Sequence, residues 1–289
     1  MQEKQIQWFP GHMAKTKRLI RESLTLVDIV IEILDARIPY SSHNPDIEKL
    51  AQNKPRLILL NKASLADPRV SALWRDSFVN NETRCIFTDC STGQGLNEVI
   101  PAVRTLLSDK LSRYAERGMT GRTLKALVVG IPNSGKSTFI NRMAGSAKAK
   151  AENRPGVTRD KQWVQTNRGL DLLDTPGVLW PKFEDKTVGE NLAVTGAIKD
   201  GILDTENIAS ILCSRLRLLA PELLSARYKL TEDELSQNNT DFEVLEAIGR
   251  RRGFLISGGE VNTERTSVML LEEFRNGKIG RISLEKPEA

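Results

Sequence analysis

The segment GIPNSGKS, from Gly130 to Ser137, constrains the fold more than any other part of the chain. It fits the pattern G-x-x-x-x-G-K-[ST], follows the apolar run 126–129 and precedes an amphipathic stretch. In such a unit the glycines let backbone N–H groups surround phosphate oxygens, and the lysine neutralises phosphate charge. The segment therefore predicts a phosphate-binding loop between a parallel strand and a helix, with these nucleotide-binding residues: Asn133, Ser134, Gly135, Lys136, Ser137 and Thr138.

Two downstream segments complete a phosphate and magnesium site. The sequence DTPG follows the apolar run 170–173, and D-x-x-G at a strand end supplies a carboxylate, Asp174, to the Mg²⁺ shell and an N–H, that of Gly177, to the γ-phosphate. Between them, RPGVT offers Thr158, whose hydroxyl could bind Mg²⁺ when the loop closes over a triphosphate. With the Ser137 hydroxyl, we predict a magnesium site made by Ser137, Thr158 and Asp174.

Two segments upstream of the phosphate loop have the pattern of a guanine-binding site. NKAS follows the apolar run 56–60 and resembles the guanine-reading N-K-x-D, while CSTGQG at 90–95 occupies the place of the second base loop. Ras-like GTPases carry the phosphate motif first and the base motifs last, so the order here is inverted and the chain is expected to be circularly permuted. Permutation costs little when the former termini meet at the surface. The predicted base-binding residues are Asn61, Lys62, Ala63, Ser64, Asp89, Cys90 and Ser91.

Ser64 departs from the base motif. The aspartate of N-K-x-D accepts two hydrogen bonds from the guanine edge. A serine accepts one, and more weakly, so the replacement should cost about 1–3 kcal/mol of binding free energy. We expect guanine preference to be kept but reduced, and Ser64→Asp to tighten GTP binding.

Apolar runs alternate with amphipathic stretches through the first part of the chain. Strands are predicted at 29–34, 56–60, 85–88, 126–129 and 170–173, with 162–167 as a further, antiparallel strand, and helices at 46–52, 68–78, 96–114 and 136–144. This pattern is typical of a doubly wound, mostly parallel α/β sheet. Later, apolar residues recur at helical spacing around 208–219, 242–248 and 268–274. We therefore predict a GTPase domain at 1–184, with a basic segment at 1–27, and a small all-helical domain at 185–289.

Composition narrows the possible partners and cellular location of the protein. The chain has 289 residues and a formal charge of +5; residues 185–289 hold 14 Lys and Arg against 18 Asp and Glu, which leaves 28 against 19 for residues 1–184. A basic first part is compatible with a nucleic-acid partner and equally with a solvated surface. No apolar run approaches the roughly 20 residues of a membrane span, and three unpaired cysteines argue against disulfides or zinc. We expect a cytoplasmic protein without a membrane partner.

Several motifs in this permuted order mark a known family. The chain carries WFPGHMA at 8–14, Asp35-Ala-Arg37 and LWPK at 179–182 in addition to DTPG. The chain resembles the circularly permuted Ras-like GTPases that act in ribosome assembly. The resemblance implies a GTP- and GDP-binding switch that binds the maturing large ribosomal subunit and its rRNA, which stimulates hydrolysis. We expect the protein to be a monomer. Candidate RNA-binding residues, which could also be ordinary surface side chains, are Arg250, Arg251, Arg252, Lys15, Lys17 and Arg18.

The catalytic group is not evident from the nucleotide motifs. Val178 stands where Ras-like enzymes place a water-positioning glutamine, so intrinsic hydrolysis is expected to be slow. His12 is a candidate because an imidazole can polarise water near neutral pH, although a structural role is equally open. Asn133 stands where potassium-activated GTPases hold a K⁺ ion; alternatively it only braces the loop. Two other functions remain open: a nucleotide-regulated RNA-binding module with incidental hydrolysis, and a P-loop ATPase or kinase.

Overall fold

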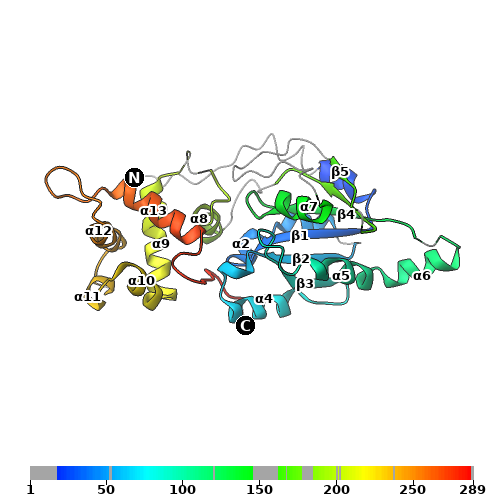
Figure 1. The fold of residues 1–289 in the computed structure, drawn as a ribbon, viewed down its shortest axis with the longest axis horizontal. Coiled ribbons are helices and arrows are strands. Elements are labelled where there is room, and N and C mark those ends of the chain that lie inside the picture. Colours follow the sequence, from blue (N-terminus) through cyan, green and yellow to red (C-terminus); the bar gives the residue numbers. More distant parts are fainter. Residues whose placement is uncertain are drawn as a thin grey trace.

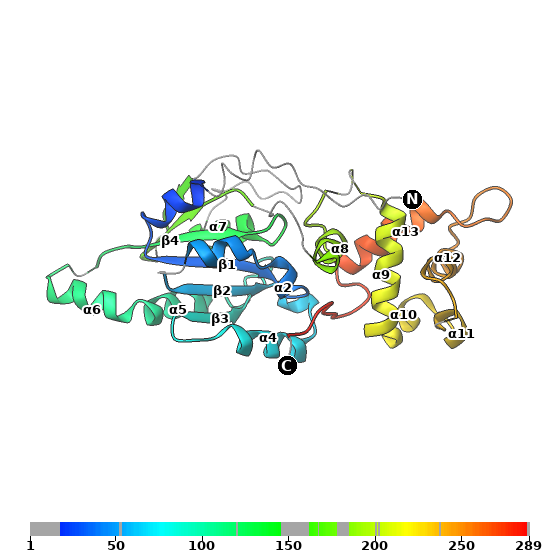
Figure 2. The ribbon, with the colours of Figure 1, turned by 180° about the vertical axis from the view of Figure 1, so that it is seen from behind.

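The computed structural model describes residues 18–51, 54–119, 121–145, 162–166, 168–177, 185–199, 201, 203–236 and 238–287. A sheet flanked by helices forms one side of the molecule, and a group of helices forms the other (Figure 1). The C-terminal segment leaves the helical group and runs back to the sheet side, ending near helix α4 (Pro68–Phe78), as the view from behind also shows (Figure 2). Within the described ranges, no helix is both long and apolar enough to cross a membrane.

The sheet has six strands in the order β3-β2-β1-β4-β6-β5. All neighbouring strands pair in parallel except β5 and β6, which pair antiparallel, so the predicted mixed sheet is confirmed. Because the parallel strands point the same way, the loops after β1, β2, β3, β4 and β6 meet at one edge. The strands are β1 Ile29–Asp35, β2 Arg56–Asn61, β3 Thr83–Phe87, β4 Leu124–Gly130, β5 Gln162–Val164 and β6 Leu170–Asp174.

Helices cover both faces of the sheet, as a doubly wound fold requires. Alternate residues of β1 point to opposite faces: Ile31 packs in the core with α5 and α7, whereas Val30 packs with α3. Every residue of β1 is buried, and five of its seven residues are Ile, Val or Leu, as expected for a strand covered on both faces. The helices of this part are α2 Pro39–Ser42, α3 Pro45–Leu50, α4 Pro68–Phe78, α5 Val99–Leu106, α6 Ser108–Glu116 and α7 Lys136–Ala144.

One predicted helix, 96–114, is divided in the structure. A 3-10 turn, Leu96–Glu98, leads into α5, and the chain leaves helical geometry at Leu107 (φ −107°, ψ 18°) before α6 begins. Leu107 is buried in the core under the sheet, while α6 has no buried residue and extends away from the sheet (Figure 1). Burial of Leu107 therefore accompanies the change of direction, and the sequence there contains no glycine or proline that would reveal it.

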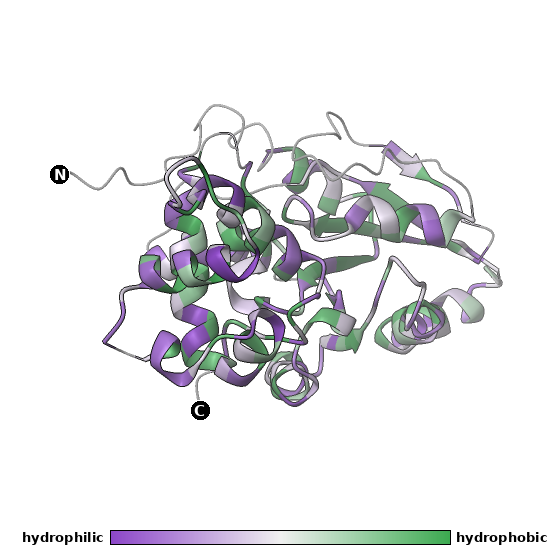
Figure 3. Cartoon of the chain, turned by 60° about the vertical axis from the view of Figure 1, so that its left-hand side comes forward, coloured by the Kyte–Doolittle hydropathy of each residue, from purple (hydrophilic) through white to green (hydrophobic). Residues whose placement is uncertain are grey.

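The second part of the chain is helical, as predicted. Its amphipathic helices turn apolar side chains towards one another, and polar and apolar patches alternate around them in Figure 3. Ile38 and Ile131, which follow β1 and β4, belong to the same apolar core, so this core continues into the edge of the sheet. The helices are α8 Lys186–Val194, α9 Thr205–Leu219, α10 Pro221–Tyr228, α11 Glu232–Leu235, α12 Asp241–Arg251 and α13 Thr263–Arg275.

Candidate nucleotide site

The predicted phosphate loop joins β4 to α7 in the expected geometry. β4 ends at Gly130 and α7 begins at Lys136, and Gly135 between them has φ +98°, in the left-handed region that favours glycine. A side chain at Gly130 would lie 2.8 Å from the Ile33 carbonyl oxygen of the neighbouring strand. The turn therefore requires glycine at 135, and close packing against β1 requires glycine at 130. The N-terminus of α7 faces the loop.

Lys136 and Asp174 meet at this end of the sheet. The Lys136 ammonium donates to Asp174 Oδ1, and both side chains are almost fully buried. Burial lowers the pKa of Lys136, and the Asp174 carboxylate opposes that shift. Phosphates bound by Lys136 and a cation bound by Asp174 would thus be immediate neighbours.

The other predicted phosphate and magnesium residues fall partly within the structure. Ser137 follows Lys136 at the start of α7, and a Cβ on Gly177 would lie 3.1 Å from the backbone nitrogen of Pro132, so the DTPG segment closes against the phosphate loop. Thr158 and Val178 lie outside the described residues.

Asn61 connects all three nucleotide loops. Its amide Nδ2 donates to the Ser134 carbonyl oxygen of the phosphate loop (2.6 Å), and its Oδ1 accepts from the backbone N–H of Cys90 in the second base loop (2.9 Å). Asn61 is 2 % exposed. One buried side chain therefore fixes the base loops against the phosphate loop, although the base loops precede it in sequence.

Lys62 is held by an ion-pair network that sequence analysis did not predict. Its ammonium lies 2.9 Å from Asp35 Oδ2, and the Arg37 guanidinium donates to both oxygens of the same carboxylate (2.9 and 2.7 Å). Burial alone would raise the pKa of Asp35, but the charges of Arg37 and Lys62 hold it well below its usual range. Asp35 and Arg37 thus position the first base loop through Lys62. The sequence pattern alone did not indicate this role.

Ser64 and Asp89 are also in contact. The Ser64 hydroxyl donates to Asp89 Oδ2, which brings the first base loop to the second. Cys90, the next residue, is buried, and burial raises the pKa of its thiol to about 12. Cys90 therefore contributes its backbone N–H, and its thiol is unreactive at neutral pH.

The C-terminal segment braces the first base loop. The Arg281 guanidinium donates to the carbonyl oxygens of Ala63 (3.0 Å) and Ala66 (2.9 Å), and the N–H of Ile282 donates to the Leu65 carbonyl oxygen (2.9 Å). Leu284 N–H donates to the Arg37 carbonyl oxygen (2.9 Å). Residues near the end of the chain thus contact the predicted GTPase domain, which no local pattern indicated.

Asn133 links the phosphate loop to the helical domain. It adopts a left-handed conformation (φ +59°), and its Nδ2 donates to the Gly196 carbonyl oxygen just after α8 (2.6 Å). A cation would be bound by the amide oxygen, so this hydrogen bond and a K⁺ ligand are compatible uses of the same side chain.

Three candidate RNA-binding arginines form ion pairs within the helical domain. Arg251 pairs with Glu234 (3.0 Å), Arg252 with Glu273 (3.2 Å), and Arg250 with Glu246 (3.3 Å). On the sheet side, Arg18 is 81 % exposed and pairs with Glu22. His12, Lys15 and Lys17 lie outside the described residues.

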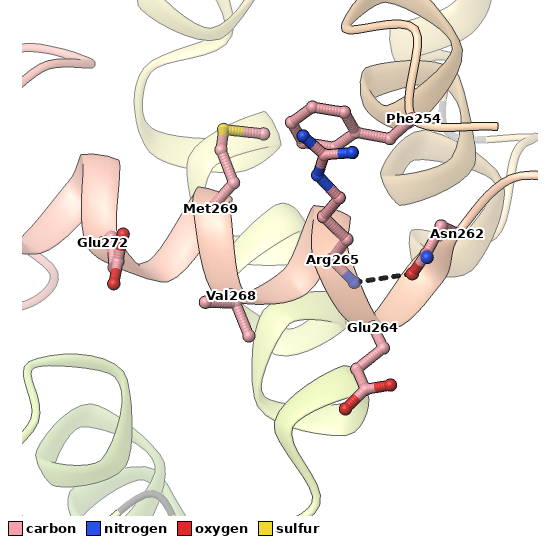
Figure 4. A pocket seen from close by; sticks show the side chains of 7 residues that line it. All are labelled: Phe254, Asn262, Glu264, Arg265, Val268, Met269 and Glu272. Atoms are coloured by element: carbon pink, nitrogen blue, oxygen red, sulfur yellow. Dashed lines mark hydrogen bonds between the residues drawn. The ribbon is translucent and has the colours of Figure 1, made fainter.

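A groove of about 350 Å³ runs along α13 in the helical domain (Figure 4). The Arg265 guanidinium lies 4.2 Å from the centre of the Phe254 ring. The backbone N–H of Arg265 donates to Oδ1 of Asn262, the residue that caps the start of α13 (2.9 Å). The groove contains none of the nucleotide motifs, so it is separate from the site at the sheet edge.

Comparison with known proteins agrees with this geometry. A family described as 50S ribosome-binding GTPase matches residues 125–222. Ribosome biogenesis GTPase A of Bacillus pumilus is 47 % identical over 98 % of this chain and 99 % of its own length. The chain belongs to the ribosome biogenesis GTPase A family. It is therefore a GTP hydrolase that binds GTP and GDP and acts in ribosome biogenesis.

Solved structures of the ribosome biogenesis GTPase A family share the fold. YlqF of Thermotoga maritima in a GNP-bound form has a TM-score of 0.64 and 28 % identity, covering 95 % of this chain and 99 % of its own. A GDP-bound YlqF gives the same TM-score with 26 % identity, over 93 % of this chain and 99 % of its own. The circularly permuted fold predicted from the motif order is thereby confirmed.

Proposed function

We propose that the nucleotide held by this site controls binding of the protein to the maturing large ribosomal subunit, and that hydrolysis releases it. The observation that carries the proposal is the hydrogen bond from Asn133 to Gly196 (2.6 Å), which joins the phosphate loop to the helical domain. A change at the γ-phosphate can therefore reach the helical domain through one side chain.

Co-sedimentation with large ribosomal subunits in GTP, GDP and a non-hydrolysable GTP analogue tests this proposal. We expect binding with GTP and with the analogue, and weaker binding with GDP. Equal binding in all three would contradict the switch and favour an RNA-binding module in which hydrolysis is incidental.

Within the site we propose separate roles for its residues. Asn61 to Ser64 and Asp89 to Ser91 bind the base, while Asn133 to Thr138 and Gly177 bind phosphate. GTPases of this family use Mg²⁺, and Ser137, Asp174 and Thr158 supply the oxygen ligands that this hard cation prefers. The buried contact between Asp174 and Lys136 supports this assignment, because it holds the carboxylate beside the phosphate loop.

His12 is proposed to polarise the attacking water. We expect His12→Ala to lower the subunit-stimulated rate of GTP hydrolysis by about 100-fold, a typical contribution of general base catalysis, with GTP affinity nearly unchanged. Single-turnover hydrolysis and a GTP titration measure the two effects. A wild-type rate in the variant would remove His12 from the mechanism.

A potassium ion beside Asn133 is proposed to assist hydrolysis. We expect faster hydrolysis in KCl than in NaCl at equal ionic strength, and we expect Asn133→Gly to abolish the difference. Glycine suits this variant because it tolerates φ +59° while removing the amide. Equal rates of the wild-type protein in both salts would contradict the K⁺ role.

The rRNA is proposed to contact basic side chains on both parts of the protein. Lys15, Lys17 and Arg18 are one candidate set, and Arg250, Arg251 and Arg252 are a second. If these side chains contact phosphates, subunit affinity should fall steeply with salt. Arg251 and Arg252 already pair with Glu234 and Glu273, and Arg18 pairs with Glu22, so RNA phosphates would have to compete with a glutamate in both sets.

A further inference from the structure

The first base loop lacks the family aspartate, yet a carboxylate stands beside the vacated position. Ser64 follows β2 and Asp89 follows β3, and these neighbouring parallel strands bring the two residues together at the sheet edge. The Ser64 hydroxyl donates to Asp89 Oδ2. The charge missing from the position of Ser64 is thus present one strand away.

Asp89 is fixed in this orientation by its own loop. Its Oδ1 accepts from the backbone N–H groups of Ser91 (3.1 Å) and Thr92 (3.4 Å), which leaves Oδ2 directed towards Ser64. Burial tends to raise the pKa of Asp89, but the hydrogen bonds from Ser64, Ser91 and Thr92 outweigh it and lower the pKa below its usual value. The side chain is ionised at neutral pH.

An ionised carboxylate also fixes the polarity of Ser64. A free serine hydroxyl can donate or accept, so it would accommodate the N1–H of guanine or the bare N1 of adenine. A carboxylate only accepts, so the Ser64 proton must point to Asp89 and the Ser64 oxygen is left as an acceptor. The pair therefore offers acceptors alone.

We propose that Asp89, paired with Ser64, supplies the carboxylate that reads the guanine edge in this chain. The N1–H and N2–H₂ groups of guanine are donors that match two acceptors, whereas adenine has no donor at N1 or C2. This inference rests on the proposed placement of the base between the two loops. It makes Asp89 a specificity-determining residue and Ser64 its partner.

The contact changes the expected effect of Ser64→Asp. Alone, a second carboxylate would face Asp89 at hydrogen-bond distance, and two like charges there repel. We expect this variant to weaken GDP binding rather than tighten it. Exchanging the pair, Ser64→Asp with Asp89→Ser, restores one carboxylate and one hydroxyl in contact.

Nucleotide binding by Asp89→Asn tests the inference. The asparagine keeps an oxygen for the N–H groups of Ser91 and Thr92 and presents an NH₂ group in place of Oδ2. Xanthine carries an oxygen where guanine carries N2–H₂, so an NH₂ donor there suits xanthosine diphosphate. We expect Kd for GDP to rise by about tenfold or more, and Kd for xanthosine diphosphate to fall by a similar factor.

Asp109→Asn is the matched control, because Asp109 is exposed on α6, away from the site. It should bind both nucleotides like the wild type. If the wild type itself bound no guanine nucleotide, the proposed site would fail. If the wild type bound GDP and Asp89→Asn kept the same ratio of the two Kd values, the role of Asp89 alone would be overturned.

If Asp89→Asn does not fold, GDP binding by the double variant Ser64→Asp with Asp89→Ser tests the inference independently. We expect the double variant to bind GDP at least about tenfold more tightly than Asp89→Ser alone. A double variant no better than Asp89→Ser would overturn the inference.

Discussion

Lys136→Met is expected to reduce GTP hydrolysis by at least about 100-fold. Methionine keeps the unbranched apolar stem but removes the ammonium that neutralises phosphate charge at the start of α7. Truncating one partner of a buried charge pair costs about 2–5 kcal/mol, which corresponds to a large loss of affinity or rate. Single-turnover hydrolysis at saturating enzyme measures the effect.

The variant also leaves the buried Asp174 carboxylate without its ammonium partner, so stability must be measured beside activity. We expect a loss of about 3 kcal/mol or more in the free energy of unfolding. Lys49→Met, an exposed lysine on α3, is the control and should behave as the wild type. A Lys136→Met protein that hydrolysed GTP within threefold of the wild-type rate would remove Lys136 from the site.

Gly135→Ala is expected to disrupt the site through its contact with Asn61. The added Cβ would lie 2.2 Å from Asn61 Nδ2, the atom that donates to the Ser134 carbonyl oxygen. Alanine at φ +98° is also strained by about 1–2 kcal/mol. Because the amide must move, we expect a total loss of about 3 kcal/mol or more in stability and a GDP affinity lower by at least about tenfold.

Gly145→Ala separates backbone strain from the contact. Gly145 ends α7 with φ +69°, and a Cβ there would meet nothing within 4 Å. We expect only the strain cost of about 1 kcal/mol, with GDP affinity unchanged. Denaturant unfolding and a GDP titration of both variants give the comparison, and equal losses in the two would contradict the connecting role of Asn61.

Local sequence patterns predicted the elements that present the nucleotide loops. The predicted bounds of α4 and α7 are those of the structure, because Asp67 and Pro68 begin α4 with a side-chain cap and a fixed φ, and Gly145 ends α7. The short apolar runs likewise located the five parallel strands of the sheet. Each of these signals lies within a few residues of the helix end or strand that it predicts.

Contacts between distant segments could not be predicted in this way. Arg281 bonds to Ala63, Asn133 to Gly196, and Ser64 to Asp89, and each pair joins residues whose own neighbours show no periodic pattern for the contact. The sequence did identify Ser64 as a departure from its motif. Only the pairing of β2 with β3 reveals that Asp89 stands beside it.

We propose that base loops and a phosphate loop in inverted order form a GTP switch that acts on the large ribosomal subunit. Its most direct test is single-turnover GTP hydrolysis by the wild-type protein with and without purified large subunits, with Lys136→Met as the blank. We predict that the subunits raise the rate by at least about tenfold, as when a partner completes a GTPase site. The same rate with and without subunits, in protein that binds GDP, would contradict the claim.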